Sequence, residues 1–402
     1  MALGQNDFNE LLSATIQKIE KQLVDNVLTA HPTLDFLKAN VKSATGPSVI
    51  FPIIAADDTS TVFTDASGTF STAKSSDILG VAKYDWAEPL VSKVRVEFKQ
   101  LEMNSGPEAV VSLAKAHLDA AVKGHGKKIA TVLHTAGSAG AGAFNTLDEI
   151  ISNSDKLTTT TARTVGGIRG GDSVKTITNV ERTGGSAIYT VGANDYIVGD
   201  LVTVSGLTTS VLNIPTAQAI TAVTATTFSV ADTGGTIAST ADSGTATVAA
   251  IKTYWKATEK SLAKSGGSAV DIRVAFRTIS DDIYVASGER PNAIIAGRDV
   301  FSEYENSFDS KIQYNNVSGT GETRFRQIDF DGIPVRLDPD APVNTAYFIN
   351  TDYLVARYLA SNFMKAMPAQ QIVGTLDTVT PLATVLCFGT NNRRAHGKLV
   401  RV

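Results

Sequence analysis

Histidine and cysteine are the first candidates for chemistry, because these side chains most often bind metals or act as bases and nucleophiles. His117, His125 and His134 share one predicted helix. At about 100° per residue their spacings do not place all three on one face, and no His-Glu-x-x-His motif is present. We interpret them as polar surface or bend residues. The single cysteine, Cys387, lies in an apolar run and is interpreted as a small buried strand residue.

Three groups of neighbouring acidic residues come next, since paired carboxylates bind divalent cations or perform acid–base catalysis. They are Asp57-Asp58, Asp281-Asp282 and Asp338-Pro339-Asp340. No further ligand accompanies any of them in the sequence, so we interpret all three as solvated loop or helix surface.

Glycine-rich and basic stretches do not form a recognised phosphate-binding or nucleic-acid-binding motif either. Residues 137–142 and 166–171 lack the Lys-Ser or Lys-Thr of a P-loop and the spacing of a dinucleotide-binding loop, and are interpreted as turns or linkers. The only basic cluster is the tail 393–398, Arg-Arg-Ala-His-Gly-Lys. It is too short for a nucleic-acid module and faces either DNA or an acidic neighbour.

These residues form no catalytic constellation. We therefore predict no catalytic, cofactor-binding or metal-binding residue, no cofactor and no enzymatic activity. The 402 residues carry a net charge of −4, without the basic excess that broad duplex binding requires. One cysteine excludes an internal disulfide and a cysteine-rich zinc site, and fits a reducing cytoplasm. The sequence lacks a signal pattern at its start and any apolar run of about 18 residues.

Several predicted elements instead expose surfaces that need partners. Residues 7–29 have the pattern of an amphipathic helix, whose apolar stripe packs either on its own core or across a neighbouring subunit. Strands at 47–54 and 91–101 bracket the polar stretch 55–83, which predicts a long hairpin arm that finds a partner surface. A helix over 107–134, starting at a proline and roughly 40 Å long, follows.

Composition then shifts. From about 171 to 250 the chain is dominated by Thr, Val, Ala, Gly and Ser, and short β-type runs alternate with turn signals. The runs are Ser173–Val180, Ala187–Val191, Asp200–Ser205, Ala219–Val223, Thr227–Val230 and Thr245–Ile251. Because the chain on both sides is mixed α and β, we predict an inserted all-β module rather than a terminal fusion.

The remaining chain alternates short helices and strands. We predict helices over 269–286 and 298–308, strands at 291–296, 346–349, 383–388 and 398–402, and a hairpin over 327–337 that turns at Asp331-Gly332.

The order of these parts resembles the Hong Kong 97-type capsid fold of tailed bacteriophages, over roughly residues 1–170 and 252–402. The segments that carry the resemblance are Thr164-Val165-Gly166-Gly167-Ile168-Arg169, Tyr254-Trp255-Lys256, Arg290-Pro291-Asn292-Ala293-Ile294-Ile295 with Tyr304-Glu305, Phe330-Asp331-Gly332-Ile333-Pro334-Val335 through Asp338, and Ala346-Tyr347-Phe348-Ile349-Asn350. Their order is more specific than any single segment. The tryptophan segment is displaced by the β-rich insertion, which resembles small β-modules of phage tail and surface proteins.

The resemblance implies an α+β fold in five parts. These are an N-terminal arm with an amphipathic helix (1–44), an extended hairpin or E-loop (45–104), a spine helix with a peripheral domain (105–170), an inserted all-β sandwich or barrel at the surface (171–251), and an axial domain that returns to the peripheral domain (252–402).

By the same resemblance, the chain is expected to be a structural major capsid protein of the virion capsid. Hexamers and pentamers would assemble in the bacterial host cytoplasm into an icosahedral shell around double-stranded DNA. Expected partners are other copies of the chain, a portal protein, a decoration protein, weakly contacted packaged DNA and no membrane. A separate scaffolding protein is expected because the chain has no room for a scaffolding segment ahead of the arm. Lys74 lies in the polar stretch, but no partner asparagine or catalytic acid is identified, so no cross-link is predicted.

Three alternatives stay open at this point. The first keeps the fold in an encapsulin-type cellular compartment around an enzyme cargo. The second is a surface β-protein that binds carbohydrate through residues 171–250, although that stretch offers few aromatic residues (Tyr189, Tyr196 and Phe228). The third is an enzyme with an unrecognised site.

Overall fold

The structure is a computed structural model that describes residues 32–33, 41–55, 79–96, 107–140, 142–266, 269–307, 327–359, 365–372 and 377–402. The predicted helix over 7–29, Asp57-Asp58 and Lys74 lie outside these residues. Among the helices of the described ranges, none has the length and apolar character needed to cross a membrane. Below, "the body" means the described residues outside 171–251.

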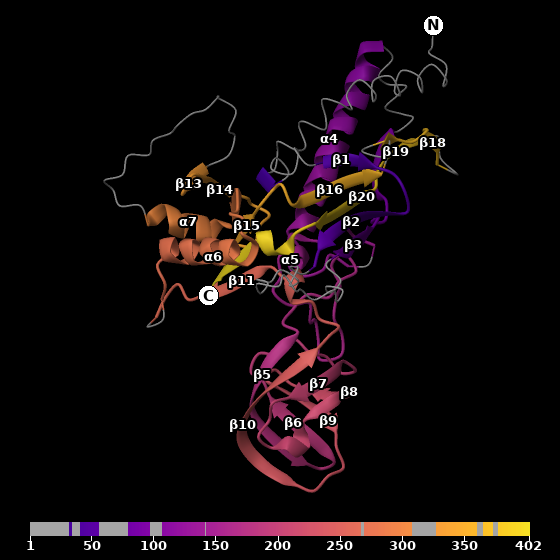
Figure 1. Ribbon diagram of the computed structural model, residues 1–402. Helices are drawn as coiled ribbons and strands as arrows, with labels where there is room; N and C mark the ends of the chain where they lie inside the picture. The colour runs from indigo at the N-terminus through magenta and orange to yellow at the C-terminus, as the bar shows by residue number, and fades with distance from the viewer. Residues whose placement is uncertain are drawn as a thin grey trace, which may run out of the picture.

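A six-stranded mixed sheet lies at the centre of one half of the body, in the order β11-β21-β15-β12-β14-β13 (Figure 1). Its strands are β11 (Thr258–Leu262), β12 (Ala293–Ala296), β13 (Gln327–Phe330), β14 (Ile333–Leu337), β15 (Thr345–Ile349) and β21 (Gly397–Arg401). Both faces are covered, since Ile294 packs into one hydrophobic core and its neighbour Ile295 into another. Burial on both faces explains why β12 and β15 are apolar throughout instead of alternating.

Helices α6 (Ile272–Ser287) and α7 (Arg298–Asn306) cover one face of this sheet. Asp271 caps the start of α6 by accepting a hydrogen bond from the backbone N–H of Arg273, and Gly288 ends it in the left-handed conformation at φ 75°. Phe276 of α6 stacks on Tyr304 of α7 with ring centroids 4.8 Å apart, which locks the two helices together.

The long helix α4 (Pro107–Leu133) runs through the other half of the body (Figure 1). Beside it lies β4 (Leu90–Val96), which pairs with β19 (Thr378–Thr384); β19 also pairs with β17 (Lys365–Ala366) and β18 (Gln370–Gln371). A second sheet joins β1 (Val41–Ala44), β16 (Leu354–Leu359) and β20 (Leu386–Thr390). The hairpin of β2 (Ser48–Ile54) and β3 (Leu79–Asp85) packs against the same core as the end of α4.

Residues 174–248 form a closed six-stranded barrel that projects from the body (Figure 1). Its strands are β5 (Val174–Thr183), β6 (Ser186–Thr190), β7 (Leu201–Ser205), β8 (Ile214–Val223), β9 (Thr227–Ala231) and β10 (Ile237–Val248). The barrel has a hydrophobic core of its own, in which Tyr189 stacks on Phe228 at 5.0 Å. Because the ring of strands is closed, the barrel presents no free strand edge to other chains.

The predicted α+β class is confirmed, and so are the long helix, both later helices and the hairpin turning at Asp331-Gly332. The division of the chain into five functional parts stays a prediction. Each predicted β-run of residues 171–250 overlaps one strand of the barrel.

The strands predicted at 47–54 and 91–101 are confirmed as β2 and, within the described residues, as β4, but the hairpin expected between them was wrong. β2 pairs with β3, inside the stretch that we assigned to a polar loop, whereas the strand predicted at 91–101 pairs as β4 with β19. The sequence of β3 did not indicate a strand, because only Ala82 and Tyr84 of it are buried and it has no run of large apolar residues. The strand predicted at 383–388 is also wrong: Thr384 ends β19 and Leu386 begins β20, which pairs in a different sheet.

Candidate assembly surfaces and the buried joint that positions them

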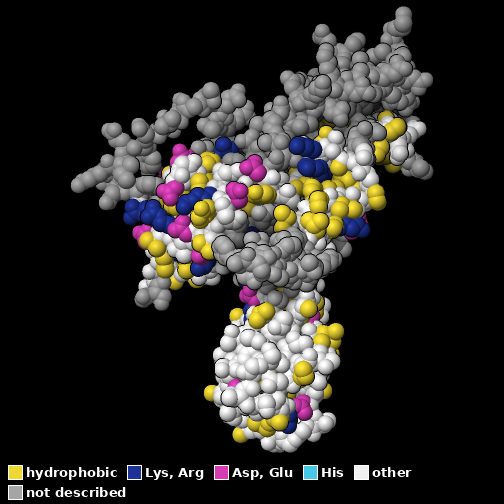
Figure 2. Space-filling view, in the orientation of Figure 1, with side chains coloured by type: hydrophobic (Ala, Val, Ile, Leu, Met, Phe, Trp, Pro, Cys, Tyr) yellow, Lys and Arg dark blue, Asp and Glu magenta, His cyan; other side chains and the backbone are white. Residues whose placement is uncertain are grey.

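The β2–β3 hairpin exposes an apolar face. Opposite residues of an antiparallel pair share a face, and alternate residues of both strands point away from the body. Lys83 and Asp85 form an ion pair at one end of this face. We call its apolar part the hairpin face: Ile50, Pro52, Ile54, Leu79 and Val81. Ile54 and Leu79 are opposite each other and are 75% and 74% exposed. Figure 2 shows hydrophobic side chains gathered on this part of the body. Clustered exposed apolar residues mark a surface that contacts another molecule.

The opposite side of the hairpin is fixed to the body. Val49, Ile53, Ala82 and Tyr84 are buried in the core. The Tyr84 hydroxyl donates to the backbone carbonyl of Thr390 at 2.6 Å and accepts from the Thr390 N–H at 3.1 Å. Burial raises the pKa of Tyr84, so it stays a neutral donor. The hairpin face therefore has a fixed direction relative to the rest of the subunit.

A buried ion pair joins distant parts of the body. Arg393 and Asp155 are both fully buried, and the Arg393 guanidinium contacts the carboxylate through Nη1 at 2.7 Å and Nη2 at 3.1 Å. The remaining guanidinium hydrogen bonds go to the backbone carbonyls of Glu149, Ile150, Ser152 and Trp255. A fully hydrogen-bonded arginine of this kind fixes the position of every segment that it contacts.

The carboxylate of Asp155 holds the point where the chain leaves the body for the barrel. It accepts from the backbone N–H of Gly170 at 2.6 Å and from Arg163 at 3.1 Å. A Cβ on Gly170 would lie only 1.9 Å from the carbonyl oxygen of Trp255. The segment that leaves for the barrel and the segment that returns from it can therefore lie this close to each other only because residue 170 is glycine. The backbone N–H of Lys252 also donates to the carbonyl of Arg169 at 2.9 Å.

A second set of charges clamps the barrel to this joint. Arg169 makes a bidentate ion pair with Asp200, at 2.6 and 3.0 Å, and donates to the carbonyl of Asp195 at 2.7 Å. Lys156 reaches the carbonyl of Asn194 at 2.7 Å. Both partners of the Arg169–Asp200 pair are about nine-tenths buried, where ionic hydrogen bonds are strong, so the barrel has a fixed direction relative to the body.

Two of the three helix histidines are not surface residues, contrary to our interpretation. His125 is buried, with its Nδ1 2.8 Å from the Ser92 hydroxyl, and burial lowers its pKa to about 4. His134 is buried too, with Nε2 2.7 Å from the hydroxyl of Thr33 and 3.4 Å from the Asp338 carboxylate. The sequence hid both because their partners lie far away along the chain.

Asp338 is correspondingly not a solvated loop residue. It is fully buried and accepts from the N–H of Thr33 at 3.2 Å and of Asp340 at 3.0 Å. Burial by itself raises the pKa of Asp338, but the hydrogen bond and charge of His134 and the hydrogen bond of Thr33 outweigh it and hold the pKa well below its usual range. This cluster ties the end of α4 to the turn after β14.

The basic tail is an internal structure, so the prediction that it faces DNA or an acidic neighbour was wrong. Arg393 is the buried arginine described above, and His396 is buried with a pKa lowered to about 3 by burial and by the charge of Arg393. Lys398 bridges Asp148 at 2.8 Å and Glu259 at 2.9 Å. Arg393, Lys398 and the neutral His396 hold the end of the chain inside the body.

The other residues that the sequence singled out, an acidic pair, a glycine-rich turn and the cysteine, have structural roles. Asp282 pairs with Lys260 at 2.7 Å on the surface. Gly166 and Gly167 both have positive φ in a tight turn between Val165 and Ile168. Cys387 is buried in β20, as predicted, and burial raises its pKa to about 12. No group of three or more His, Cys, Asp or Glu side chains that could hold a metal ion occurs within the described ranges.

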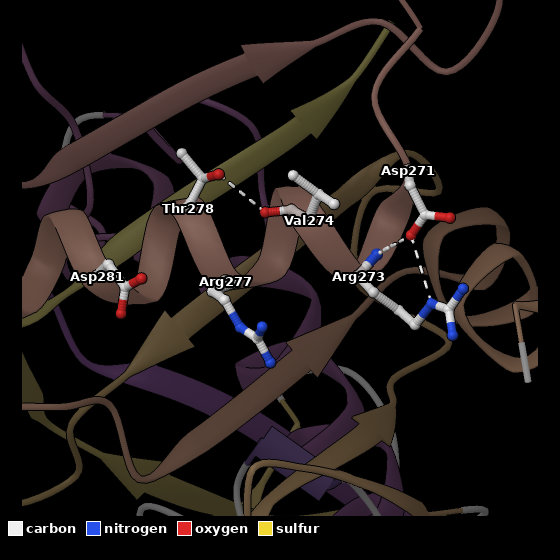
Figure 3. A pocket seen from close by; sticks show the side chains of 6 residues that line it. All are labelled: Asp271, Arg273, Val274, Arg277, Thr278 and Asp281. Carbon is white, nitrogen blue, oxygen red and sulfur yellow. Dashed lines mark hydrogen bonds and ion pairs between the residues drawn. The ribbon is translucent and has the colours of Figure 1, made fainter.

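A hollow of about 620 Å³ lies along α6 and its cap (Figure 3). The residues that line it are Asp271, Arg273, Val274, Arg277, Thr278 and Asp281. Their polar groups bond locally: Arg273 pairs with Asp271 at 3.5 Å, and the Thr278 hydroxyl donates to the carbonyl of Val274 at 2.8 Å. One helix and its cap supply all of them, so among the described residues no second element brings a reactive group to face them.

The sequence matches no protein-family model and no curated protein. Among solved structures, the chain is similar to one titled "Cyanophage A-1(L) capsid asymmetric unit", with 13% identity, 92% of each chain covered and a TM-score of 0.49. It is also similar to a satellite phage P4 procapsid that includes the size determination protein, with 9% identity, 95% of this chain and 90% of that chain covered, and a TM-score of 0.45.

A third similar structure is a virus-like particle from Pyrococcus furiosus. It is 12% identical, the match covers 97% of this chain and 98% of that chain, and the TM-score is 0.42.

The buried ion pair leads to a stability prediction. Replacing Arg393 by methionine leaves the Asp155 carboxylate buried without its counter-charge, and we expect the free energy of unfolding to fall by about 3–5 kcal/mol. Asp155→Asn should cost a similar amount, while the double variant should cost less than the sum of the two. Denaturant unfolding followed by circular dichroism measures all three.

The matched control is Arg394→Ala, because this neighbouring arginine is only half-buried. It should change the free energy of unfolding by less than about 0.5 kcal/mol. Equal effects at residues 393 and 394, or strict additivity of the double variant, would contradict the assigned role of the pair.

The buried histidines predict acid sensitivity. His125 has a folded-state pKa of about 4 against an ordinary value of 6.5, so between these pH values only the unfolded chain binds its proton. Its contribution is complete above pH 6.5 and is lost as the pH falls toward 4, by about 3 kcal/mol. The free energy of unfolding, measured at a series of pH values, should therefore rise with pH between about 4 and 6.5. His125→Gln should reduce this pH dependence by the equivalent of about one proton. Ser92→Ala, which keeps the histidine, should leave it in place. An unchanged pH dependence in His125→Gln would show that His125 does not cause it.

Proposed function

We propose that this chain is a shell-building subunit, the major capsid protein of a tailed bacteriophage. Hexamers and pentamers of it would close into an icosahedral shell around double-stranded DNA. The observation that carries the proposal is the hairpin face, an exposed apolar surface held rigidly on one side of the body. The order of hairpin, long helix, inserted barrel and mixed α/β domain supports it, since this is the order that the sequence resemblance implies.

The hairpin face needs a partner outside its own subunit. Its inner side already packs on the core, so the two strands cannot turn Ile54 and Leu79 inward without exposing Val49 and Ile53. Covering each large exposed side chain contributes on the order of 1–2 kcal/mol, against which the cost of association must be set. One such contact is weak, but in a closed shell every subunit makes it, and the contacts add up over the assembly.

We assign the barrel to the shell surface as an accessory domain. Its closed strand ring offers no edge for strand exchange, and the Arg169–Asp200 clamp keeps it pointing in one direction. Its three large aromatic residues are buried in its own core, which removes the stacking platform that carbohydrate binding through residues 171–250 would require.

The remaining assignments belong to the same proposal. The parts 1–44, 45–104, 105–170, 171–251 and 252–402 would act as arm, E-loop, spine with peripheral domain, surface domain and axial domain. Partners would be further copies of the chain, a separate scaffolding protein, a portal protein and a decoration protein. Assembly would take place in the bacterial cytoplasm without enzymatic activity of the subunit.

Assembly tests the proposal. The unmodified chain, expressed with a candidate scaffolding protein, should form closed particles of uniform size in negative-stain electron microscopy. The double variant Ile54→Lys/Val81→Lys places two charges on the hairpin face, where they would be buried unpaired in a contact. It should keep its circular dichroism spectrum and thermal midpoint, because both positions are exposed, and yet remain as unassembled subunits in sedimentation velocity.

The control variant Leu201→Lys/Val211→Lys changes two exposed residues of the barrel, 58% and 65% exposed, and should still assemble. A strictly monomeric unmodified chain under all these conditions would refute the shell proposal. Normal shells from Ile54→Lys/Val81→Lys would refute the role of the hairpin face. Particles that enclose protein and no DNA in the host would favour a cellular compartment instead.

Deleting the barrel tests its accessory role. Gly170 and Lys252 form a β-bridge, so a short glycine–serine linker can replace residues 171–250 without moving the body. We expect particles of the same diameter with a smoother surface in electron micrographs. A folded but non-assembling deletion variant would make the barrel part of the shell contacts and contradict this assignment.

A further inference from the structure

The middle of α4 carries lysines that have no partner among the residues that the structure describes. Lys123, Lys127 and Lys128 are exposed, and none of them makes an ion pair or a side-chain hydrogen bond with any described residue. The deeply buried cations of the body differ in this respect, since Arg393, Lys398 and Arg401 are each paired with a carboxylate. Three positive charges on α4 are therefore available to a partner.

The three lysines border one face of the helix. At about 100° per residue, Lys123 and Lys128 lie roughly 140° apart around the axis, with Lys127 between them. The exposed residues on the same arc are small: Ala120, Gly124 and Thr131. A Cβ built on Gly124 meets nothing within 4 Å. The face, which we call the lysine face, is thus a flat strip with positive charges along its borders.

The opposite arc of α4 is the buried one. Leu118, Val122, Ile129 and Leu133 pack into the body, and His125 sits beneath the middle of the strip. A helix anchored along one side in this way cannot rotate, so the lysine face keeps a fixed orientation. Asp119, one turn before Lys123, lies about 40° outside the strip, beyond its Lys123 border.

We propose that the lysine face contacts the phosphate backbone of double-stranded DNA, an inference that rests on the proposed shell function. From Lys123 to Lys128 the helix rises about 7.5 Å, a length over which a duplex carries about four phosphate charges. Lysine acts as a point charge for phosphate and reads no base sequence. The small residues between the lysines let a sugar-phosphate strand approach the helix closely.

The charge balance decides the strength of this contact. The whole chain carries a net charge of −4, so a single subunit binds DNA weakly and releases it readily. A shell repeats the three charges at every subunit. This arrangement screens packaged DNA over the whole interior without immobilising any one segment. The lysine face also replaces the tail 393–398 as the basic surface of the chain, because Arg393 and Lys398 of the tail are buried and paired with carboxylates.

Salt-dependent binding tests the inference. Purified full-length chain, kept unassembled, is titrated against a labelled duplex of random sequence between 50 and 300 mM salt, conditions that span the range in which phosphate contacts weaken. We expect Lys123→Gln/Lys127→Gln/Lys128→Gln to raise the Kd about tenfold or more at the lowest salt. The slope of log K against log salt should become shallower by about 2.7, which corresponds to three lost phosphate contacts.

The matched control removes three positive charges elsewhere, as Lys42→Gln/Lys264→Gln/Arg298→Gln, at exposed positions of β1, of the segment after β11 and of α7. It should keep the slope of the unmodified chain. An equal loss in this control, or an unchanged slope in the α4 variant, would overturn the inference. Binding of a poly-glutamate peptide at salt concentrations where duplex DNA does not bind would overturn it in favour of an acidic protein partner.

Negative-stain images of the same samples under assembly conditions keep the two proposals apart. Shells from the α4 variant, together with the predicted loss of DNA affinity, support both. If the unmodified chain forms no shells, the shell function fails, whereas the slope difference between the two triple variants still decides whether α4 binds phosphate.

Discussion

The ion pair between Arg393 and Asp155 is the contact on which the arrangement of the described parts depends. It is fully buried, and the guanidinium and carboxylate together reach α5 (Leu147–Ile150), the outgoing chain at Gly170 and the returning chain at Trp255. Burial of two charges is costly, and the cost is offset only when every hydrogen-bonding position is used, as it is here. The pair therefore specifies one arrangement of these segments rather than adding much net stability.

Rigidity around this joint has a direct consequence for the surfaces. The sheet with two covered faces holds one core under α6 and α7 and shares the other with α4 and the hairpin. Tyr84 and Thr390 fix the hairpin to that second core, while Arg169 and Asp200 fix the barrel to the joint. The hairpin face, the lysine face and the barrel are thus carried in set directions by one body. A subunit that must repeat identical contacts with many neighbours needs this property.

Elements with a local pattern could be predicted from the sequence. The long helix, α6 and the barrel strands have periodicities or turn signals within a few residues. The bounds of both helices agree closely with the structure, and each predicted β-run overlaps one barrel strand, although β8 and β10 begin several residues earlier than predicted. The hairpin face could be predicted in part as well, since the sequence indicated an arm between residues 45 and 104 that contacts a partner. The hairpin partner was missed because β3 alternates small and large residues that a composition count treats as loop.

Long-range polar contacts could not be predicted. Arg393 lies 238 residues from Asp155, and Asp338 lies far from both His134 and Thr33, so no spacing in the sequence links them. A charged residue next to other charged residues has the same local signature whether it is solvated or buried with a distant counter-charge. The tail 393–398 shows the consequence: the sequence indicated a basic surface, whereas folding buries Arg393 and Lys398 against carboxylates and leaves the lysines of α4 exposed.

We propose that this chain is a subunit of a closed shell in which neighbouring subunits cover the hairpin face. A cryo-electron microscopy reconstruction of assembled particles of the unmodified chain tests it most directly. We expect a closed icosahedral shell in which Ile54 and Leu79 contact a neighbouring subunit and the barrel stands on the outer surface. Particles in which the hairpin face is exposed to solvent, or in which the barrels point into the interior, would contradict it.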